Sequence, residues 1–138
     1  MDSLENVYLE SRDHSVLLKD SLQDIRVNRE LFDVTLASDD GEQIQAHKVI
    51  LSACSPIFRR MLISNHHPHP LLFMRGLKSA ELNEVLNFIY QGSVNIYHGD
   101  VPDFLSLANE LEIQGLTKGK HTDQINQSSS NDPPGENM

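Results

Sequence analysis

Residues 46–58 read Ala-His-Lys-Val-Ile-Leu-Ser-Ala-Cys-Ser-Pro-Ile-Phe, and this run places two short helices one directly after the other. The first predicted helix runs from Lys48 to Ala53. The second opens at Ser55-Pro56, because serine is a preferred N-cap residue and proline is favoured in the first helical turn. The apolar side of this second helix is formed by Ile57, Phe58, Met61 and Leu62.

A β-hairpin is predicted immediately before these helices. The segment 33–37 is rich in β-branched residues, which favours a strand. The dipeptide Asp40-Gly41 is a strong hairpin signal, and residues 43–47 form the return strand. After the helices, a polar loop at 64–70 leads to a short buried strand at 71–74.

Three more helices follow from hydrophobic periodicity. One runs from Asp13 or Ser15 to about Val27, with Leu18, Leu22 and Ile25 on one face. The clearest spans 79–90, where Ser79 is the predicted cap and Gly92 the stop. A short strand at 94–96 then leads to a helix capped by Asp100, whose buried face is formed by Phe104, Leu105, Ala108 and Leu111.

These elements predict an α+β fold, a mostly helical cluster flanked by a small three-stranded sheet, in one domain over residues 1–116. From residue 117 onward the chain is polar, and Ile125 is its single aliphatic residue before the terminal Met138. Such a segment cannot bury enough apolar surface to offset its ordering entropy, so residues 117–138 are predicted to be a disordered tail or linker.

Composition argues against several classes of function. The formal net charge of −9 disfavours direct binding to the phosphate backbone of nucleic acids. No run of about 18 apolar residues predicts a membrane span, and the first residues do not read as a signal peptide. Cys54 is the single cysteine, which excludes an internal disulfide and fits a reducing compartment. A soluble, intracellular protein is expected.

Several of these segments together resemble the BTB/POZ domain. The resemblance rests on Phe32-Asp33-Val34-Thr35-Leu36, on residues 46–58, on Phe88-Ile89-Tyr90-Gln91-Gly92-Ser93-Val94 and on residues 104–116, all in the order of the family. Within the family, residues 46–58 look most like the Tramtrack-type subgroup of zinc-finger transcription factors. The opening phrase typical of that subgroup is matched at Leu9 and His14, but its Arg-Trp-Asn core is absent.

The resemblance implies self-association. In the family, the first helix and the strand before it pack against a second copy across a two-fold axis. The dimer-interface residues predicted here are Val7, Tyr8, Leu9, His14, Leu17, Leu18 and Leu22. The residues themselves leave open whether Val16 and Leu17 form an interface or only widen the core-facing stripe of the first helix.

Two charged residues match a pocket found at the dimer interface of BTB domains from transcription factors. These are Asp33 and Lys48, which would fix register and partner choice more than add affinity. The simpler alternative is that Asp33 caps a turn and that Lys48 is exposed to solvent.

Catalytic and metal-binding interpretations are weak. His47 is predicted to be a packed, hydrogen-bonded core histidine and Cys54 a small buried residue. The cluster His66-His67-Pro68-His69 is predicted to be a solvated loop, because structural zinc normally takes four ligands. We therefore expect no enzyme, no cofactor and no metal.

The expected function is homo-oligomerisation, and also hetero-oligomerisation, of a nuclear transcriptional regulator. The chain itself would be the main partner, and other BTB proteins and corepressor peptides would be further partners. The alternative is a substrate adaptor for a cullin-type ubiquitin ligase. Such adaptors usually carry a hydrophobic-x-Glu/Asp pattern near the third helix, and no acidic residue occurs between Phe58 and Asn65.

Overall fold

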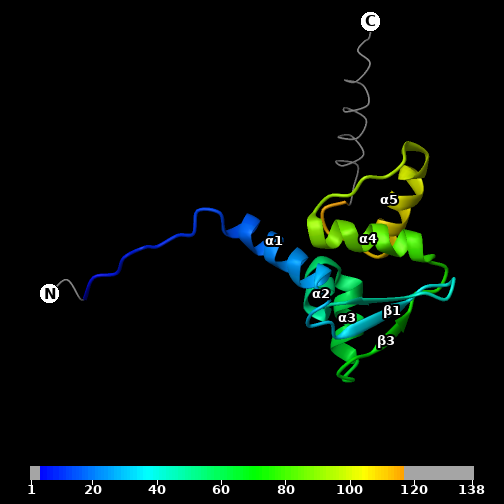
Figure 1. Ribbon diagram of the computed structural model, residues 1–138, viewed down its shortest axis with the longest axis horizontal. Coiled ribbons are helices and arrows are strands. Elements are labelled where there is room, and N and C mark those ends of the chain that lie inside the picture. The colour runs from blue at the N-terminus through cyan, green and yellow to red at the C-terminus, as the bar shows by residue number, and fades with distance from the viewer. Residues whose placement is uncertain (1–3, 117–138) are drawn as a thin grey trace, which may run out of the picture.

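The computed structural model describes residues 4–116 (Figure 1). In chain order its elements are α1 (His14–Val27), β1 (Val34–Ala37), β2 (Gln43–Ala46), α2 (Lys48–Cys54), α3 (Pro56–Ser64), β3 (Leu71–Phe73), α4 (Ser79–Gln91), the short 3-10 helix η2 (His98–Asp100) and α5 (Val101–Glu110). This order confirms the predicted α+β class. The predicted tail, residues 117–138, lies outside the described residues.

The three strands form one mixed sheet in the order β2-β1-β3. The hairpin of β1 and β2 is antiparallel as predicted, and its turn places Gly41 at a positive φ of 90°. By contrast, β3 runs parallel to β1 and lies at the edge of the sheet. The expectation that this last strand is buried is wrong. Side chains alternate across a strand, so Leu72 packs on the core while Leu71 and Phe73 remain exposed.

Helix α4 supplies the largest share of the core. Its predicted apolar stripe is buried and consists of Leu82, Val85, Leu86 and Ile89, together with Tyr90. The helix stops at Gly92, whose φ of 80° is the left-handed conformation that glycine adopts easily.

The start of α4 differs from the prediction, because Lys78 and not Ser79 is the N-cap residue. The carboxylate of Glu81 accepts a hydrogen bond from the Lys78 backbone N–H at 3.0 Å. The hydroxyl and backbone N–H of Ser79 instead donate to the Asp40 carboxylate, each at 3.0 Å. Ser79 therefore ties α4 to the β1–β2 turn, a contact that local sequence does not reveal.

The predicted strand at residues 94–96 is not formed. A strand exists only when its backbone hydrogen-bonds to a neighbour, and the sheet in the described residues consists of β2, β1 and β3 alone. Within residues 4–116, the backbone groups of Val94, Asn95 and Ile96 form no hydrogen bond to another strand. Val94 and Ile96 are half-buried against the core, whereas Asn95 is exposed.

The N-terminal part of the chain leaves the body of the molecule. Residues 4–13, here called the arm, contain no strand and run away from the helical cluster, and α1 projects in the same direction (Figure 1). Among the described helices, none is long and apolar enough to cross a lipid bilayer.

Candidate protein-interaction surface

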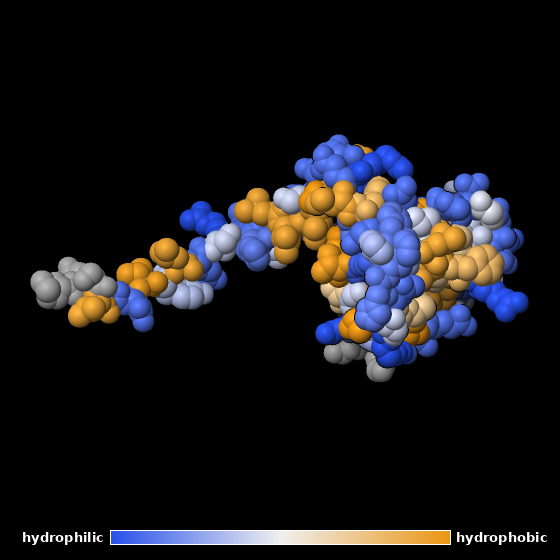
Figure 2. Space-filling model, turned by 90° about the horizontal axis from the view of Figure 1, so that it is seen from below, coloured by the Kyte–Doolittle hydropathy of each residue, from blue (hydrophilic) through white to orange (hydrophobic). Residues whose placement is uncertain are grey.

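Apolar side chains on the arm and on α1 remain in solvent. Val7, Tyr8 and Leu9 are 78%, 82% and 85% exposed. On α1, Leu17 and Leu18 are 59% and 50% exposed, and Val16 is exposed to a similar degree. Figure 2 shows hydrophobic residues along the arm and α1, which protrude from the remaining structure. Large apolar side chains left in solvent on one protruding part of a chain often mark a protein-interaction site.

Only the C-terminal half of α1 is attached to the rest of the chain. Leu22 and Ile25 are half-buried, and Leu22 packs on the core. One nitrogen of the Arg26 guanidinium donates to Oδ1 of Asn87 at 3.0 Å, and its central carbon lies 4.6 Å from the centre of the Tyr90 ring. These contacts orient α1 and leave its first two turns uncovered.

The predicted interface residues therefore lie on one continuous part of the chain. Val7, Tyr8 and Leu9 are on the arm and His14 begins α1, while Leu17 and Leu18 are on its uncovered turns. Leu22 differs, because it already contributes to the core of the single chain. Their role in an interface stays a prediction.

Asp33 and Lys48 are neighbours, but their charged groups do not form an ion pair in residues 4–116. Oδ1 of Asp33 accepts a hydrogen bond from the backbone N–H of Lys48 at 2.8 Å, at the first residue of α2. The Lys48 ammonium group donates to the His67 carbonyl at 3.0 Å. Both residues are half-buried. The charged pocket stays a prediction, and Asp33 also has a structural role in capping α2.

His47 is a packed, hydrogen-bonded core residue, as predicted. Its side chain is buried, and its ring nitrogens lie 2.6 Å from the Tyr90 hydroxyl and 2.8 Å from the Glu30 carbonyl oxygen. Cys54 is half-buried and free, and burial raises the pKa of its thiol. A raised pKa lowers the thiolate fraction at neutral pH, so Cys54 is a poor nucleophile.

The histidine loop is exposed, as predicted. His69 shares a hydrogen bond of 2.8 Å with the Thr35 hydroxyl, and its backbone N–H donates to Nδ1 of His67 at 2.9 Å. Within the described part of the chain, no group of three or more His, Cys, Asp or Glu residues is placed to hold a metal ion.

Two hollows were not anticipated from the sequence. One, of about 570 Å³, lies beside residues 92–96 and is bordered by Phe88, Phe104 and Leu116. The other, of about 520 Å³, lies between α3, the segment after β3 and α5. The acidic residues that line the second are Glu81, Asp103 and Glu110, and its sequence signal is the seven-residue spacing of Asp103 and Glu110, which places both on one face of α5.

Comparison with protein families matches residues 22–128 of this chain to the model of the BTB/POZ domain. The sex determination protein fruitless of Drosophila melanogaster is 35% identical over an alignment of 128 residues, which covers 88% of this chain and 13% of fruitless. The Drosophila protein abrupt is 44% identical over 96 residues, 70% of this chain and 10% of abrupt. The chain thus spans only about a tenth of these relatives.

A shorter relative and two solved structures match over most of their length. Longitudinals lacking protein-like, also from Drosophila, is 34% identical over 118 residues, 86% of this chain and 92% of that protein. The BTB domain of zebrafish PATZ1 superposes with a TM-score of 0.71 at 20% identity, covering 93% of this chain and 100% of that one. The BTB domain of human gigaxonin superposes with a TM-score of 0.70 at 25% identity, and the match covers 82% of this chain and 92% of that one.

Proposed function

Because this chain belongs to the BTB/POZ family, we propose that it is a protein-interaction module that binds a second copy of itself through the arm and α1. The observation that carries this proposal is α1, a helix of 14 residues with no buried residue. A helix of this length is marginal alone in water and normally gains its stability by packing an apolar face. The exposed side chains of Val16, Leu17 and Leu18 would be covered by a partner surface.

The arm completes the same interface. Val7 and Leu9 fall on one face of an extended segment and Tyr8 on the other. Residues 94–96 alternate between half-buried and exposed, lack a strand partner in the described chain and border an apolar hollow of about 570 Å³. Backbone pairing between the arm of one copy and residues 94–96 of the other would satisfy both edges.

The charged pocket is part of this proposal. Self-association would bring Asp33 and Lys48 under the interface, where a charge must be paired or costs several kcal/mol. A pocket of this kind favours one register and one choice of partner.

The biological role we propose is the assembly of a nuclear transcriptional regulator. Pairing two chains would place two nucleic-acid-binding regions, carried elsewhere in such a regulator, at a high effective concentration. This role rests on the Tramtrack-type resemblance of residues 46–58. It also fits the small share of fruitless and abrupt that the chain spans, because most of each of these proteins lies outside the matched region. Other BTB proteins and corepressor peptides are further proposed partners.

The cullin-adaptor alternative has one specific observation in its favour, the structural likeness to the gigaxonin BTB domain. Against it, α3 carries Arg59 and Arg60 and no acidic residue. Binding of purified cullin by this chain would support the adaptor role, and self-association without cullin binding would favour the regulator.

The test is light scattering after size-exclusion chromatography over a dilution series, on the wild type and on Leu17→Asp/Leu18→Asp. Both leucines are exposed in the single chain, so the substitutions spare the core. Buried in an interface, each carboxylate would cost several kcal/mol. We expect the wild type to run as a dimer or larger assembly and the variant as a monomer.

The single variant Leu17→Asp is measured beside the double variant, and Ile63→Asp is its matched control, because Ile63 is 64% exposed on α3 and lies outside the arm and α1. The control should leave the assembly intact. A wild type that stays monomeric at micromolar concentration would refute the proposal, as would equal effects of Leu17→Asp and Ile63→Asp.

A further inference from the structure

A second surface contains no residue of the arm or α1. It is a groove of about 520 Å³ between α3, the segment after β3 and α5. Its apolar lining includes Met61 and Phe73, two large side chains that remain exposed, and the more buried Met74, Leu77, Leu107 and Leu111. An exposed phenylalanine and methionine in a concave site offer apolar contacts to a ligand.

The rim of this groove is acidic. Glu81, Asp103 and Glu110 line it, against the single basic residue Arg75. Glu81, Asp103 and Leu107 also line an adjoining hollow of about 170 Å³ between α4 and α5, which adds Glu84 and Asp100 and has no basic lining residue. The two hollows therefore form one surface, called here the acidic groove.

The carboxylates of the acidic groove are not neutralised within the chain. Among residues 4–116, none of Glu81, Glu84, Asp100 and Asp103 takes part in an ion pair. The pKa of Glu84 is raised, first by burial and then by the negative charges of Asp100 and Glu81. A cationic ligand would relieve this repulsion.

We propose that the acidic groove binds a basic amphipathic segment of a partner protein, with apolar side chains against Phe73 and Met61 and Lys or Arg side chains at the rim. Charge complementarity favours this occupant over a second copy of the chain, which carries a net charge of −9. The inference goes beyond the proposed self-association, because the two surfaces share no residue.

The experiment is fluorescence anisotropy with a short labelled helical peptide that has leucines on one face and lysines on the other. In one matched peptide glutamates replace the lysines, and in the other serines replace the leucines. We expect the first peptide to bind, and both matched peptides to bind at least about tenfold more weakly. Binding should also weaken as salt is added.

Protein variants locate the site. Asp103→Lys/Glu110→Lys and, separately, Phe73→Ser should each reduce affinity by about tenfold or more. Glu30→Lys/Glu42→Lys changes the net charge equally at exposed positions outside the groove and should change affinity by less than about threefold. Phe73 is exposed, so its replacement leaves the core intact.

Three results would overturn the proposal: no binding of the leucine–lysine peptide, equal effects of the groove and control variants, or equal binding of the serine peptide. A fall in assembly mass caused by the groove variants alone would also overturn it, since the groove would then be an interface between copies. These outcomes are separate from the Leu17→Asp/Leu18→Asp test, which concerns the arm and α1.

Discussion

The Tyr90 hydroxyl lies 2.6 Å from Nδ1 of His47, and it also accepts a hydrogen bond from the His47 backbone N–H at 3.1 Å. The carbonyl oxygen of Glu30, 2.8 Å from Nε2, can only accept, so Nε2 carries the proton and donates to it. Nδ1 of the neutral ring then accepts from the tyrosine hydroxyl. The pair fastens the start of α2 to α4 and to the chain just after α1.

Tyr90→Phe should destabilise the fold. It leaves Nδ1 and the backbone N–H of the buried His47 without their partner, which should lower the free energy of unfolding by about 2 kcal/mol. Urea denaturation at a fixed protein concentration measures the change, because association shifts apparent stability. The control Tyr97→Phe alters an exposed tyrosine and should stay within about 0.5 kcal/mol. Equal effects of the two variants would contradict the assignment.

Stability should fall at alkaline pH because of the same tyrosine. Burial, the largest cause, raises the pKa of Tyr90 to about 12, whereas an unfolded tyrosine titrates near about 10. Between these values the unfolded chain binds fewer protons, so the free energy of unfolding decreases with pH, by about 2 to 3 kcal/mol in all. Below a pH of about 10, Tyr90 does not contribute to the change of the unfolding free energy with pH.

The measurement is urea denaturation across that pH window on the wild type and Tyr90→Phe. Only the wild type should show the contribution of Tyr90, and the difference in their tyrosinate absorbance should rise near pH 12. An identical pH slope in both proteins would show that Tyr90 is not the group responsible.

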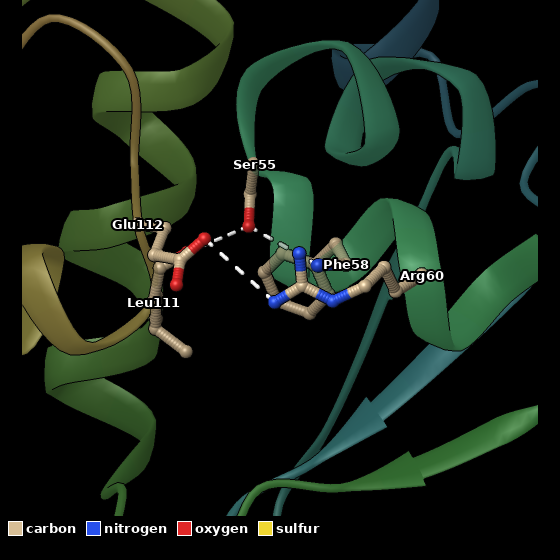
Figure 3. Close-up of polar contacts among 5 residues, drawn as sticks. All are labelled: Ser55, Phe58, Arg60, Leu111 and Glu112. Atoms are coloured by element: carbon tan, nitrogen blue, oxygen red, sulfur yellow. Dashed lines mark hydrogen bonds and ion pairs between the residues drawn. The ribbon is translucent and has the colours of Figure 1, made fainter.

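Ser55 joins two parts of the chain that are far apart in sequence. Its hydroxyl accepts from the Phe58 backbone N–H at 3.1 Å and donates to the Leu111 carbonyl at 2.6 Å (Figure 3). Ser55→Ala should cost about 1 to 2 kcal/mol of unfolding free energy, through loss of the α3 cap and of a buried bond.

The neighbouring ion pair provides the contrast. Nη2 of Arg60 lies 3.8 Å from Oε1 of Glu112, but the two side chains are 68% and 47% exposed. Such pairs contribute little, so Arg60→Ala should change stability by less than about 1 kcal/mol. Thermal or urea denaturation of both variants tests the ranking, and a larger loss for Arg60→Ala than for Ser55→Ala would contradict it.

Gly92→Ala should destabilise the end of α4. The residue has a φ of 80° with open space around it, so the cost is backbone strain and not a clash. We expect a loss of about 1 kcal/mol in the free energy of unfolding. Gly99→Ala is the control, because Gly99 also has open space and no positive φ. A smaller loss of unfolding free energy for Gly92→Ala than for Gly99→Ala would argue against backbone strain at Gly92.

The charged pocket can be tested without damaging the fold. Asp33→Asn removes the charge and keeps an oxygen that accepts from the Lys48 N–H, whereas Asp33→Ala also removes the α2 cap. We expect Asp33→Asn to shift the dimer dissociation constant. The free energy of unfolding of the separated chains should stay within about 0.5 kcal/mol of the wild-type value. Sedimentation over a dilution series measures the first quantity. An unchanged dissociation constant would exclude a role for the charge.

The local sequence was sufficient wherever residues close together in the chain determine the structure of their own segment. The apolar stripe of α4, the Asp40-Gly41 turn and the Ser55-Pro56 helix start all follow from periodicity, backbone preference or capping within a few residues, and each was predicted correctly. The predicted burial of His47 also holds, although its partners Tyr90 and Glu30 could not be identified from their positions in the sequence.

The remaining features depend on what lies beside each segment in space. Residues 94–96 read as a strand but form none, because a strand needs a neighbour and their backbone pairs with none of the three strands in residues 4–116. Ser79 reads as a cap but binds Asp40, 39 residues earlier in the chain. The acidic groove combines residues from α3, α4, α5 and the segment after β3, and its charges meet only when these elements pack together.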